Sequence, residues 1–178
     1  MRIIPRTAVI TGAPGAGKTA LIEVLTSRGW RTVPEVARAI LRQSGGMALR
    51  VSDPMEFGAA MLEREIADLE GVKEDGIWTF FDRGIGDSLG FFELSGLQPP
   101  SILVQRAAAL RYSGPIFAAP AWADIFCSDD ERTQDWDEAV ASGEAVKGTW
   151  GDAGYFPIDL PLTTPELRAD FVEARLTA

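Results

Sequence analysis

The chain has 178 residues, of which 46% are hydrophobic, and a formal net charge of −9 with no histidine and one cysteine. Because nucleic acids and anionic membranes are polyanions that require a basic face, we expect this acidic chain to bind a small molecule instead. Without histidine, proton transfer falls to carboxylates, and Cys127 alone supports neither an internal disulfide nor the usual zinc site.

The first predicted strand covers residues 7–11 and leads directly into a glycine-rich loop with the sequence GAPGAGKT. This loop fits the phosphate-binding pattern GxxxxGK[ST] at every specified position. Its glycines let backbone N–H groups turn towards phosphates, and the next helix directs its partial positive end at the anion. We therefore predict a nucleoside triphosphate site formed by Gly12, Ala13, Pro14, Gly15, Ala16, Gly17, Lys18, Thr19 and Ala20.

Two side chains of this loop have predicted roles of their own. Lys18 is expected to reach the β- and γ-phosphate oxygens, where it would also act in catalysis. Thr19 is expected to ligate Mg²⁺ through its hydroxyl. The predicted cofactors are therefore ATP and Mg²⁺.

A second predicted strand near 30–33 is followed by a polar helix face. If Pro34 opens a helix, then Glu35, Arg38 and Arg42 lie on one side of it, at i, i+3 and i+7. Glu35 could accept the proton of a substrate hydroxyl, and the two arginines could hold substrate anions. The alternative is a solvated face with an ordinary i,i+3 ion pair.

The next predicted helix has a clear beginning. Asp53 is its N-cap, Pro54 takes the first helical position and Glu56 is the capping-box partner. Its apolar face is formed by Met55, Leu62, Ile66 and Leu69. The segment 71–76 ends the helix.

The third predicted strand, 77–81, is followed directly by an acid and a guanidinium group, Asp82 and Arg83. In parallel sheets the carboxyl end of a strand lines the ligand crevice. Asp82 could hold magnesium and Arg83 could bind a phosphate or substrate group, although a structural Asp–Arg pair is the alternative. Asp87 either contacts substrate or caps the helix that begins near Ser88.

The region after the fourth predicted strand, 115–119, is expected to form a lid around 122–150. In phosphotransferases such a segment closes over the nucleotide and brings an arginine to the transferring phosphoryl group. Arg132 is the cation in its acidic stretch, and an amphipathic surface helix is the alternative. Three tryptophans of the region could stack on a base but more often fill core and lid hinges: Trp122, Trp136 and Trp150.

A fifth strand near 156–160 and a last helix opened by Thr164 and Pro165 complete the pattern. Strands and helices alternate throughout, which predicts an α/β fold: a three-layer α/β/α sandwich with a parallel five-stranded sheet. No long polar linker interrupts the chain, so residues 1–178 are expected to form one domain. The segment 101–112 is expected to be a core helix rather than a dimer surface. The sequence is compatible with a monomer or a homodimer.

These motifs, taken in order, resemble one family. The GAPGAGKT loop, the PE-x-x-R step after strand two, the FDRG-x-x-D segment after strand three and the W-x-x-I-x-x-x-D-x-E-R stretch are similar to predicted bacterial P-loop ATPases related to the ribosylnicotinamide kinase domain. The resemblance implies a nucleoside and nucleotide kinase fold, with ATP at the loop and a small acceptor opposite. It also implies that Glu35 takes the place of the general base, and that Asp82 and Arg83 serve the acceptor side.

The leading hypothesis is therefore an ATP- and Mg²⁺-dependent phosphotransferase acting on a nucleoside or nucleotide. Its predicted catalytic residues are Lys18, Glu35, Asp82, Arg83 and Arg132, and its predicted acceptor-binding residues are Glu35, Arg38, Arg42, Arg83 and Asp87. The alternatives are an ATP-hydrolysing regulatory protein and a nucleotide-binding sensor. Since the N-terminal residues lead into the strand that the loop requires and no apolar run reaches transmembrane length, we expect a cytoplasmic protein.

Overall fold

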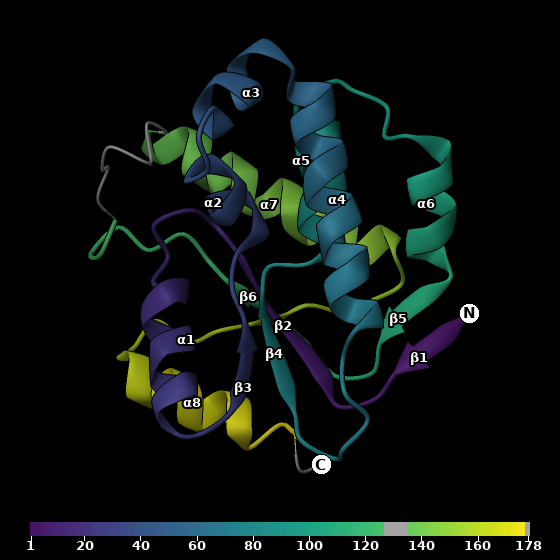
Figure 1. The fold of residues 1–178 in the computed structure, drawn as a ribbon. Coiled ribbons are helices and arrows are strands. Elements are labelled where there is room, and N and C mark those ends of the chain that lie inside the picture. Colours follow the sequence, from purple (N-terminus) through teal and green to yellow (C-terminus); the bar gives the residue numbers. More distant parts are fainter. Residues whose placement is uncertain (127–134, 177–178) are drawn as a thin grey trace.

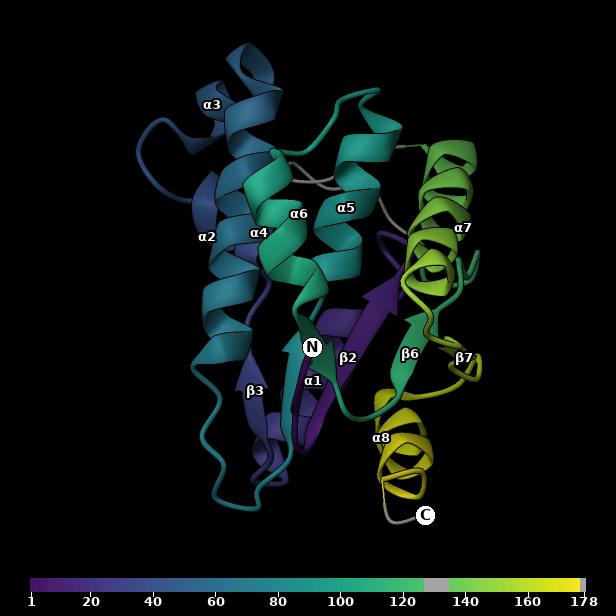
Figure 2. The ribbon, with the colours of Figure 1, turned by 90° about the vertical axis from the view of Figure 1, so that its right-hand side faces the viewer.

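The structure, a computed structural model, describes residues 1–126 and 135–176. Its centre is a five-stranded sheet in the order β3-β4-β2-β6-β7, in which every neighbouring pair is parallel. Figure 2 shows the sheet face on, with β3 at one edge and β7 at the other. The strands are β2 (Thr7–Gly12), β3 (Arg31–Val33), β4 (Thr79–Asp82), β6 (Ile116–Ala119) and β7 (Ile158–Asp159). The predicted five-stranded parallel sheet is confirmed.

The central strand β2 is buried along its whole length, so it faces a hydrophobic core on both sides. Ala8 and Ile10 belong to one core and Val9 to the other, as expected from the alternation of side chains along a strand. Helices therefore cover both faces, as Figure 1 shows, and the predicted three-layer sandwich is confirmed.

One face of the sheet carries α1 (Lys18–Ser27) and α8 (Pro165–Glu173), which pack against each other. The other face carries a larger group of helices, and the two short helices α2 and α3 pack with α4 around a third apolar cluster. Their bounds are α2 (Val36–Leu41), α3 (Gly46–Ser52), α4 (Pro54–Glu70), α5 (Ile85–Leu94), α6 (Ser101–Ala108) and α7 (Trp136–Asp152).

Two predicted helix beginnings are confirmed in atomic detail. The Asp53 carboxylate accepts a hydrogen bond of 2.9 Å from the backbone N–H of Glu56, and Pro54 takes the first position of α4. Thr164 caps α8 in the same way, accepting from the N–H of Leu167. These side chains satisfy backbone donors that a helix leaves unpaired at its N-terminus. The predicted capping box with Glu56 is not formed, because the backbone N–H of Asp53 donates to the carbonyl oxygen of Leu49 at 2.8 Å.

A second, two-stranded sheet was not predicted. It pairs β1 (Arg2–Ile4) with β5 (Leu110–Tyr112) in parallel. The segment 101–112, which was expected to be one core helix, consists of the helix α6 followed by the strand β5. Leu103 of α6 faces the core while Ile102 is exposed, so the helix is amphipathic.

The C-terminal part of the expected lid is α7, whose inner side is buried. Ala139, Val146 and Trp150 lie in the interior, and the helix packs against α5 and β2. Arg132 lies outside the described residues, so its predicted role stays a prediction. Within the part of the chain that the structure describes, no helix combines the length and apolar character needed to cross a bilayer.

Candidate active site

The phosphate-binding loop runs between the end of β2 and the start of α1, at the carboxyl edge of the sheet. Gly12, Gly15 and Gly17 have φ angles of 115°, 72° and 78°, in the region that favours glycine. At Gly12 space is limiting as well, because a Cβ there would lie 2.2 Å from the carbonyl oxygen of Ala119. The glycines of the motif are therefore required by the backbone itself.

Lys18 is buried beneath this loop. Its Nζ donates hydrogen bonds to the carbonyl oxygens of Gly12, at 3.1 Å, and Ala13, at 2.6 Å. Burial, followed by the positive charge of Arg83, lowers the pKa of Lys18 to about 7, although three nearby carboxylates oppose the shift. A phosphate group at the loop would supply an additional anionic partner for the ammonium group.

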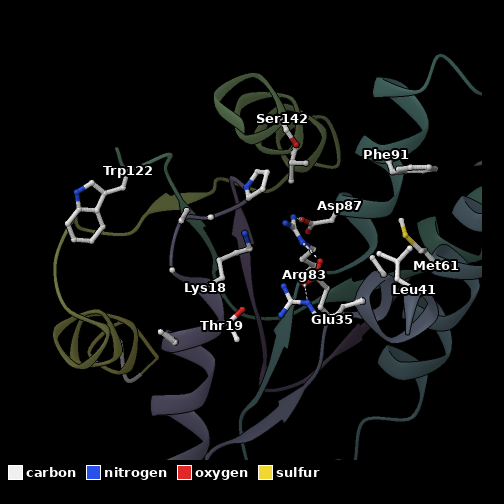
Figure 3. Close-up of a pocket in the computed structure, with 18 of the residues that line it drawn as sticks. Lys18, Thr19, Glu35, Leu41, Met61, Arg83, Asp87, Phe91, Trp122 and Ser142 are labelled. Carbon is white, nitrogen blue, oxygen red and sulfur yellow. Dashed lines mark hydrogen bonds and ion pairs between the residues drawn. The ribbon is translucent and has the colours of Figure 1, made fainter. Parts of the chain in front are cut away.

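Arg83 is the centre of a polar network beside the loop (Figure 3). It follows directly after β4 and has a φ of 69°, which is unusual for a residue with a side chain. Its Nε donates to Glu35 at 3.0 Å, and its Nη1 donates to Asp87 at 2.8 Å and to the Gly12 carbonyl at 3.3 Å. The guanidinium thus links the acids after β3 and β4 to the phosphate-binding loop.

Glu35 stands at the N-terminus of α2 with its carboxylate held between two arginines. Besides the bond from Arg83, Oε2 lies 3.6 Å from Nε of Arg38. Burial raises the pKa of Glu35, but the charges of Arg83, Lys18 and Arg38 outweigh this and lower it overall. Glu35 is therefore an ionised carboxylate that faces the cavity. Arg42, at the end of α2, also lines the cavity.

Asp82 is the last residue of β4 and is buried. Its Oδ1 has no hydrogen-bond partner among the described residues. Burial, followed by the charge of Glu35, raises the pKa of Asp82, while Arg83 and Lys18 lower it. Such an orphaned carboxylate oxygen fits a magnesium site in which the hydroxyl of Thr19 is another ligand.

Among residues 1–126 and 135–176 there is no cluster of three or more acids or cysteines suited to a metal ion. Magnesium in phosphotransferases is commonly held by one or two protein groups together with substrate phosphates and water. The predicted donors, Thr19 and Asp82, would form a set of that kind.

Asp87 accepts four hydrogen bonds. The donors are the Thr11 hydroxyl at 2.7 Å, Arg83, the backbone N–H of Gly84 at 3.1 Å and the indole of Trp150 at 3.1 Å. The helix α5 begins at Ile85, before the predicted position, and Asp87 lies in its first turn. Asp87 lines the cavity, and its predicted contact with substrate stays a prediction.

One cavity of about 1020 Å³ is lined by the loop from Pro14 onwards together with Glu35, Arg83 and Asp87, whereas Asp82 is not part of its lining. Figure 3 shows Lys18, Thr19 and Trp122 on one side of Arg83, and Leu41, Met61 and Phe91 on the other. The first end is built by the phosphate-binding loop, the second by apolar side chains of α2, α4 and α5. This volume exceeds that of most single-ligand pockets, so two small molecules can be accommodated.

Two buried, charged residues of the cavity wall, Glu65 and Arg168, were not predicted as site residues from the sequence. Glu65 is buried on α4, and Arg168 is buried on α8, where its Nη1 donates to the carbonyl oxygen of Ala16 at 2.6 Å. The guanidinium of Arg168 also lies 5.2 Å from the ring centre of Trp122. In each case the signal was a charged residue on the apolar face of a predicted helix, next to Ile66 and to Ala169 respectively.

The predicted tryptophans have different positions. Trp150 belongs to the core, Trp122 lines the cavity, and Trp136 packs edge-on against Phe126 with ring centres 5.4 Å apart. Only Trp122 is therefore placed to contact a ligand in this cavity among these three.

Comparisons with solved structures show the same fold in two other proteins, deoxyadenosine kinase and NadR. Deoxyadenosine kinase from M. mycoides, with products dCMP and dCDP bound, has a TM-score of 0.68 at 10% identity, covering 96% of this chain and 98% of that one. NadR in complex with NR has a TM-score of 0.71 at 17% identity, covering 98% of this chain and 52% of NadR. The chain therefore spans about half the length of NadR.

A second NadR structure, in complex with NAD and AMP-PNP, gives a TM-score of 0.67 at 16% identity, with coverage of 98% and 50%. A comparison with curated proteins gives no significant match. A family model described as an AAA domain matches residues 7–168, from the first strand of the sheet to Arg168 beside the phosphate-binding loop. The chain belongs to this AAA-domain family, a P-loop family, and its fold is similar to those of deoxyadenosine kinase and NadR.

Proposed function

We propose that the protein is an ATP- and Mg²⁺-dependent phosphotransferase that acts on a hydroxyl group of a nucleoside or nucleotide. The observation that carries this proposal is the contact between Glu35 and Arg83, which joins a carboxylate of the acceptor side to the phosphate-binding loop. A group that accepts a proton thus lies in the same cavity as the residues suited to ATP.

On the donor side, the loop amides and Lys18 would bind the β- and γ-phosphates. Thr19 and Asp82 would hold magnesium, which when bound neutralises charge on the phosphates and orients them. The buried Oδ1 of Asp82, without a partner among the described residues, supports this assignment.

On the acceptor side, Glu35 would orient the attacking hydroxyl and take up its proton. The hydroxyl oxygen forms the new bond to the γ-phosphorus, and the bond from that phosphorus to the bridging oxygen breaks to release ADP. The lowered pKa of Glu35 makes it a weak base. A weak base is sufficient because proton transfer is late in a loose transition state, and Arg83 would stabilise the charge that develops on the phosphoryl oxygens.

The acceptor class is supported by the cavity and by the similar structures. The end opposite the loop combines apolar walls with Arg38 and Arg42, which suits a flat ring that carries a polar or anionic group. The structures similar in fold were solved with NR and with dCMP and dCDP. We therefore expect a nucleoside or nucleotide of similar size.

The test is ADP release from ATP and Mg²⁺, measured alone and with nucleosides, nucleoside monophosphates and nicotinamide riboside. Stimulation by one acceptor, together with a phosphorylated product, is the expected result. Lys18→Ala should abolish it, and Arg175→Ala, a change at an exposed residue just after the end of α8, should not. Equal ADP release with and without every acceptor would instead establish a hydrolytic ATPase.

A further inference from the structure

Glu65 is a buried carboxyl group in the cavity wall for which the mechanism above has no role. On α4, Phe57, Met61 and Glu65 follow one another at intervals of four residues, and all three line the cavity. This spacing places side chains on one face of a helix. Only 5% of Glu65 is exposed, and the other two members of the row are apolar.

The carboxyl group is not fully satisfied by the protein. Oε2 of Glu65 has no hydrogen-bond partner of ordinary geometry within residues 1–126 and 135–176, although the Ser88 hydroxyl lies near enough to the carboxyl group to influence its pKa. Buried carboxyl oxygens with a purely structural role are nearly always paired. A ligand in the cavity is therefore the natural source of the missing hydrogen bond.

The surroundings favour the neutral form of this acid. Burial, followed by the charge of Asp87, raises the pKa of Glu65 well above its usual range, and Asp68 acts in the same direction. Ser88 and Arg83 oppose the shift without cancelling it. The remaining titratable neighbour is Tyr112, a neutral phenol in β5 whose own pKa is raised by burial.

A neutral carboxyl group has a specific recognition pattern. It presents one O–H donor beside one C=O acceptor, the complement of an N–H next to a lone pair. Amide and amidine edges of nucleobases carry that pattern. The apolar side chains of Phe57, Met61 and Phe91 in the same end of the cavity suit the faces of such a ring.

We propose that Glu65 determines acceptor specificity by pairing its carboxyl group with an amide or amidine edge of the acceptor ring. This inference rests on the proposed function, because it names the ring chemistry of that acceptor. Figure 3 shows Met61 and Phe91 on the side of Arg83 away from Lys18 and Thr19. The ring would thus lie on α4 while the hydroxyl group faces Glu35 and the loop.

The experiment compares Glu65→Leu, Glu65→Gln and wild type, with Glu63→Gln as the control on the exposed side of the same helix. Direct binding of adenosine, cytidine, uridine, inosine and nicotinamide riboside is measured by calorimetry on the full chain, independently of turnover. Two further probes lack the amino group: purine riboside is paired with adenosine, and 2-pyrimidinone riboside is paired with cytidine. The ATP affinity and acceptor KM are measured in parallel.

Glu65→Leu should weaken the binding of the preferred nucleoside about ten- to a hundred-fold. It should also abolish the difference in affinity between that nucleoside and the analogue without the paired group. Glu65→Gln, whose amide also offers a donor and an acceptor, should bind within roughly three-fold of wild type. The ATP affinity should change less than about two-fold, because Glu65 lies on α4 and forms no hydrogen bond with a loop residue within the described part of the chain.

Two results would overturn the inference. Unchanged nucleoside affinity in Glu65→Leu would show that the carboxyl group makes no contact with the ring, and an equal loss in Glu65→Gln would show that an ionised carboxylate is needed. If an acceptor is phosphorylated but its KM is the same in wild type and in the Glu65 variants, this inference fails and the proposed function stands. If nucleosides bind through Glu65 without turnover, the proposed function fails alone, and if none binds, both fail.

Discussion

Asp87 accepts a hydrogen bond of 2.8 Å from Arg83, and this contact fixes the guanidinium that binds Glu35 on its other edge. The same carboxylate accepts from Thr11, Gly84 and Trp150. One buried acid thus connects the central strand, the start of α5 and the end of α7 to the candidate active site. Breaking it should affect the fold as well as the site.

We therefore expect Asp87→Ala to lower the free energy of unfolding by about 3–5 kcal/mol, because it leaves a part-buried arginine and three other donors without their acceptor. Asp68→Ala is the matched control, since Asp68 pairs with the exposed Arg64 on the surface of α4. That substitution should cost about 0.5 kcal/mol or less. Chemical denaturation measures both, and equal losses would contradict the central role of Asp87.

Glu35→Gln should separate acceptor chemistry from nucleotide binding. Removing the proton acceptor should lower kcat by about 10²–10⁴, the range typical of a lost general base. Among the described residues, the Glu35 side chain pairs with Arg83 and Arg38 and forms no hydrogen bond or ion pair with a residue of the loop. The Kd of ATP should therefore change by no more than about two-fold, which fluorescence titration can establish. Full turnover in this variant would transfer the role of base to Asp82 or Asp87.

Arg168, on α8, supports the phosphate-binding loop. Its Nη1 donates to the carbonyl of Ala16 and its Nε to that of Pro161, so it ties α8 to the loop. Arg168→Ala should raise the KM for ATP about ten-fold through loss of these buried bonds. The acceptor KM should stay constant, and Arg175→Ala should change neither value. A rise in the acceptor KM alone would refute this assignment.

The stability of the protein should depend on pH through Glu65. Its folded pKa is raised, so its contribution is fully present below the unfolded value of 4.5 and is lost as pH rises through the folded pKa. Glu65→Gln cannot ionise and should escape that loss. The difference in unfolding free energy between this variant and wild type should therefore grow as pH rises above 4.5.

Urea denaturation at several pH values, with Glu63→Gln as the surface control, measures this difference. A difference that is the same at every pH would mean that Glu65 titrates alike in the folded and unfolded chains. That result would also remove the reason to describe its carboxyl group as neutral.

The parts of this molecule that the sequence predicted are those governed by local rules. The motif at 12–19, the cap at Asp53 and the cap at Thr164 each depend on a few consecutive residues. The five strands of the main sheet were recognised because they alternate with helices along the chain. By contrast, β1 and β5 lie outside that alternation, and their pairing joins segments more than a hundred residues apart.

The same distinction applies to the site. The candidate acids and arginines were identified because they follow strands, and parallel strands end at one edge of the sheet. Which of them touch was not predictable: the bond from Arg83 to Glu35 spans 48 positions and that from Arg168 to Ala16 spans 152. Such pairings depend on side-chain packing in three dimensions, which a one-dimensional pattern does not encode.

The continuous cavity on both sides of Arg83 has a kinetic consequence. Since the described residues at both ends line one cavity, the γ-phosphate and the acceptor would meet in one ternary complex. A covalent phosphoenzyme intermediate would then not be needed. Double-reciprocal plots against each substrate should then intersect rather than run parallel, and a chiral γ-phosphate should be transferred with inversion at phosphorus. If the protein is the proposed phosphotransferase, the shape of this cavity requires both substrates to bind before either product leaves.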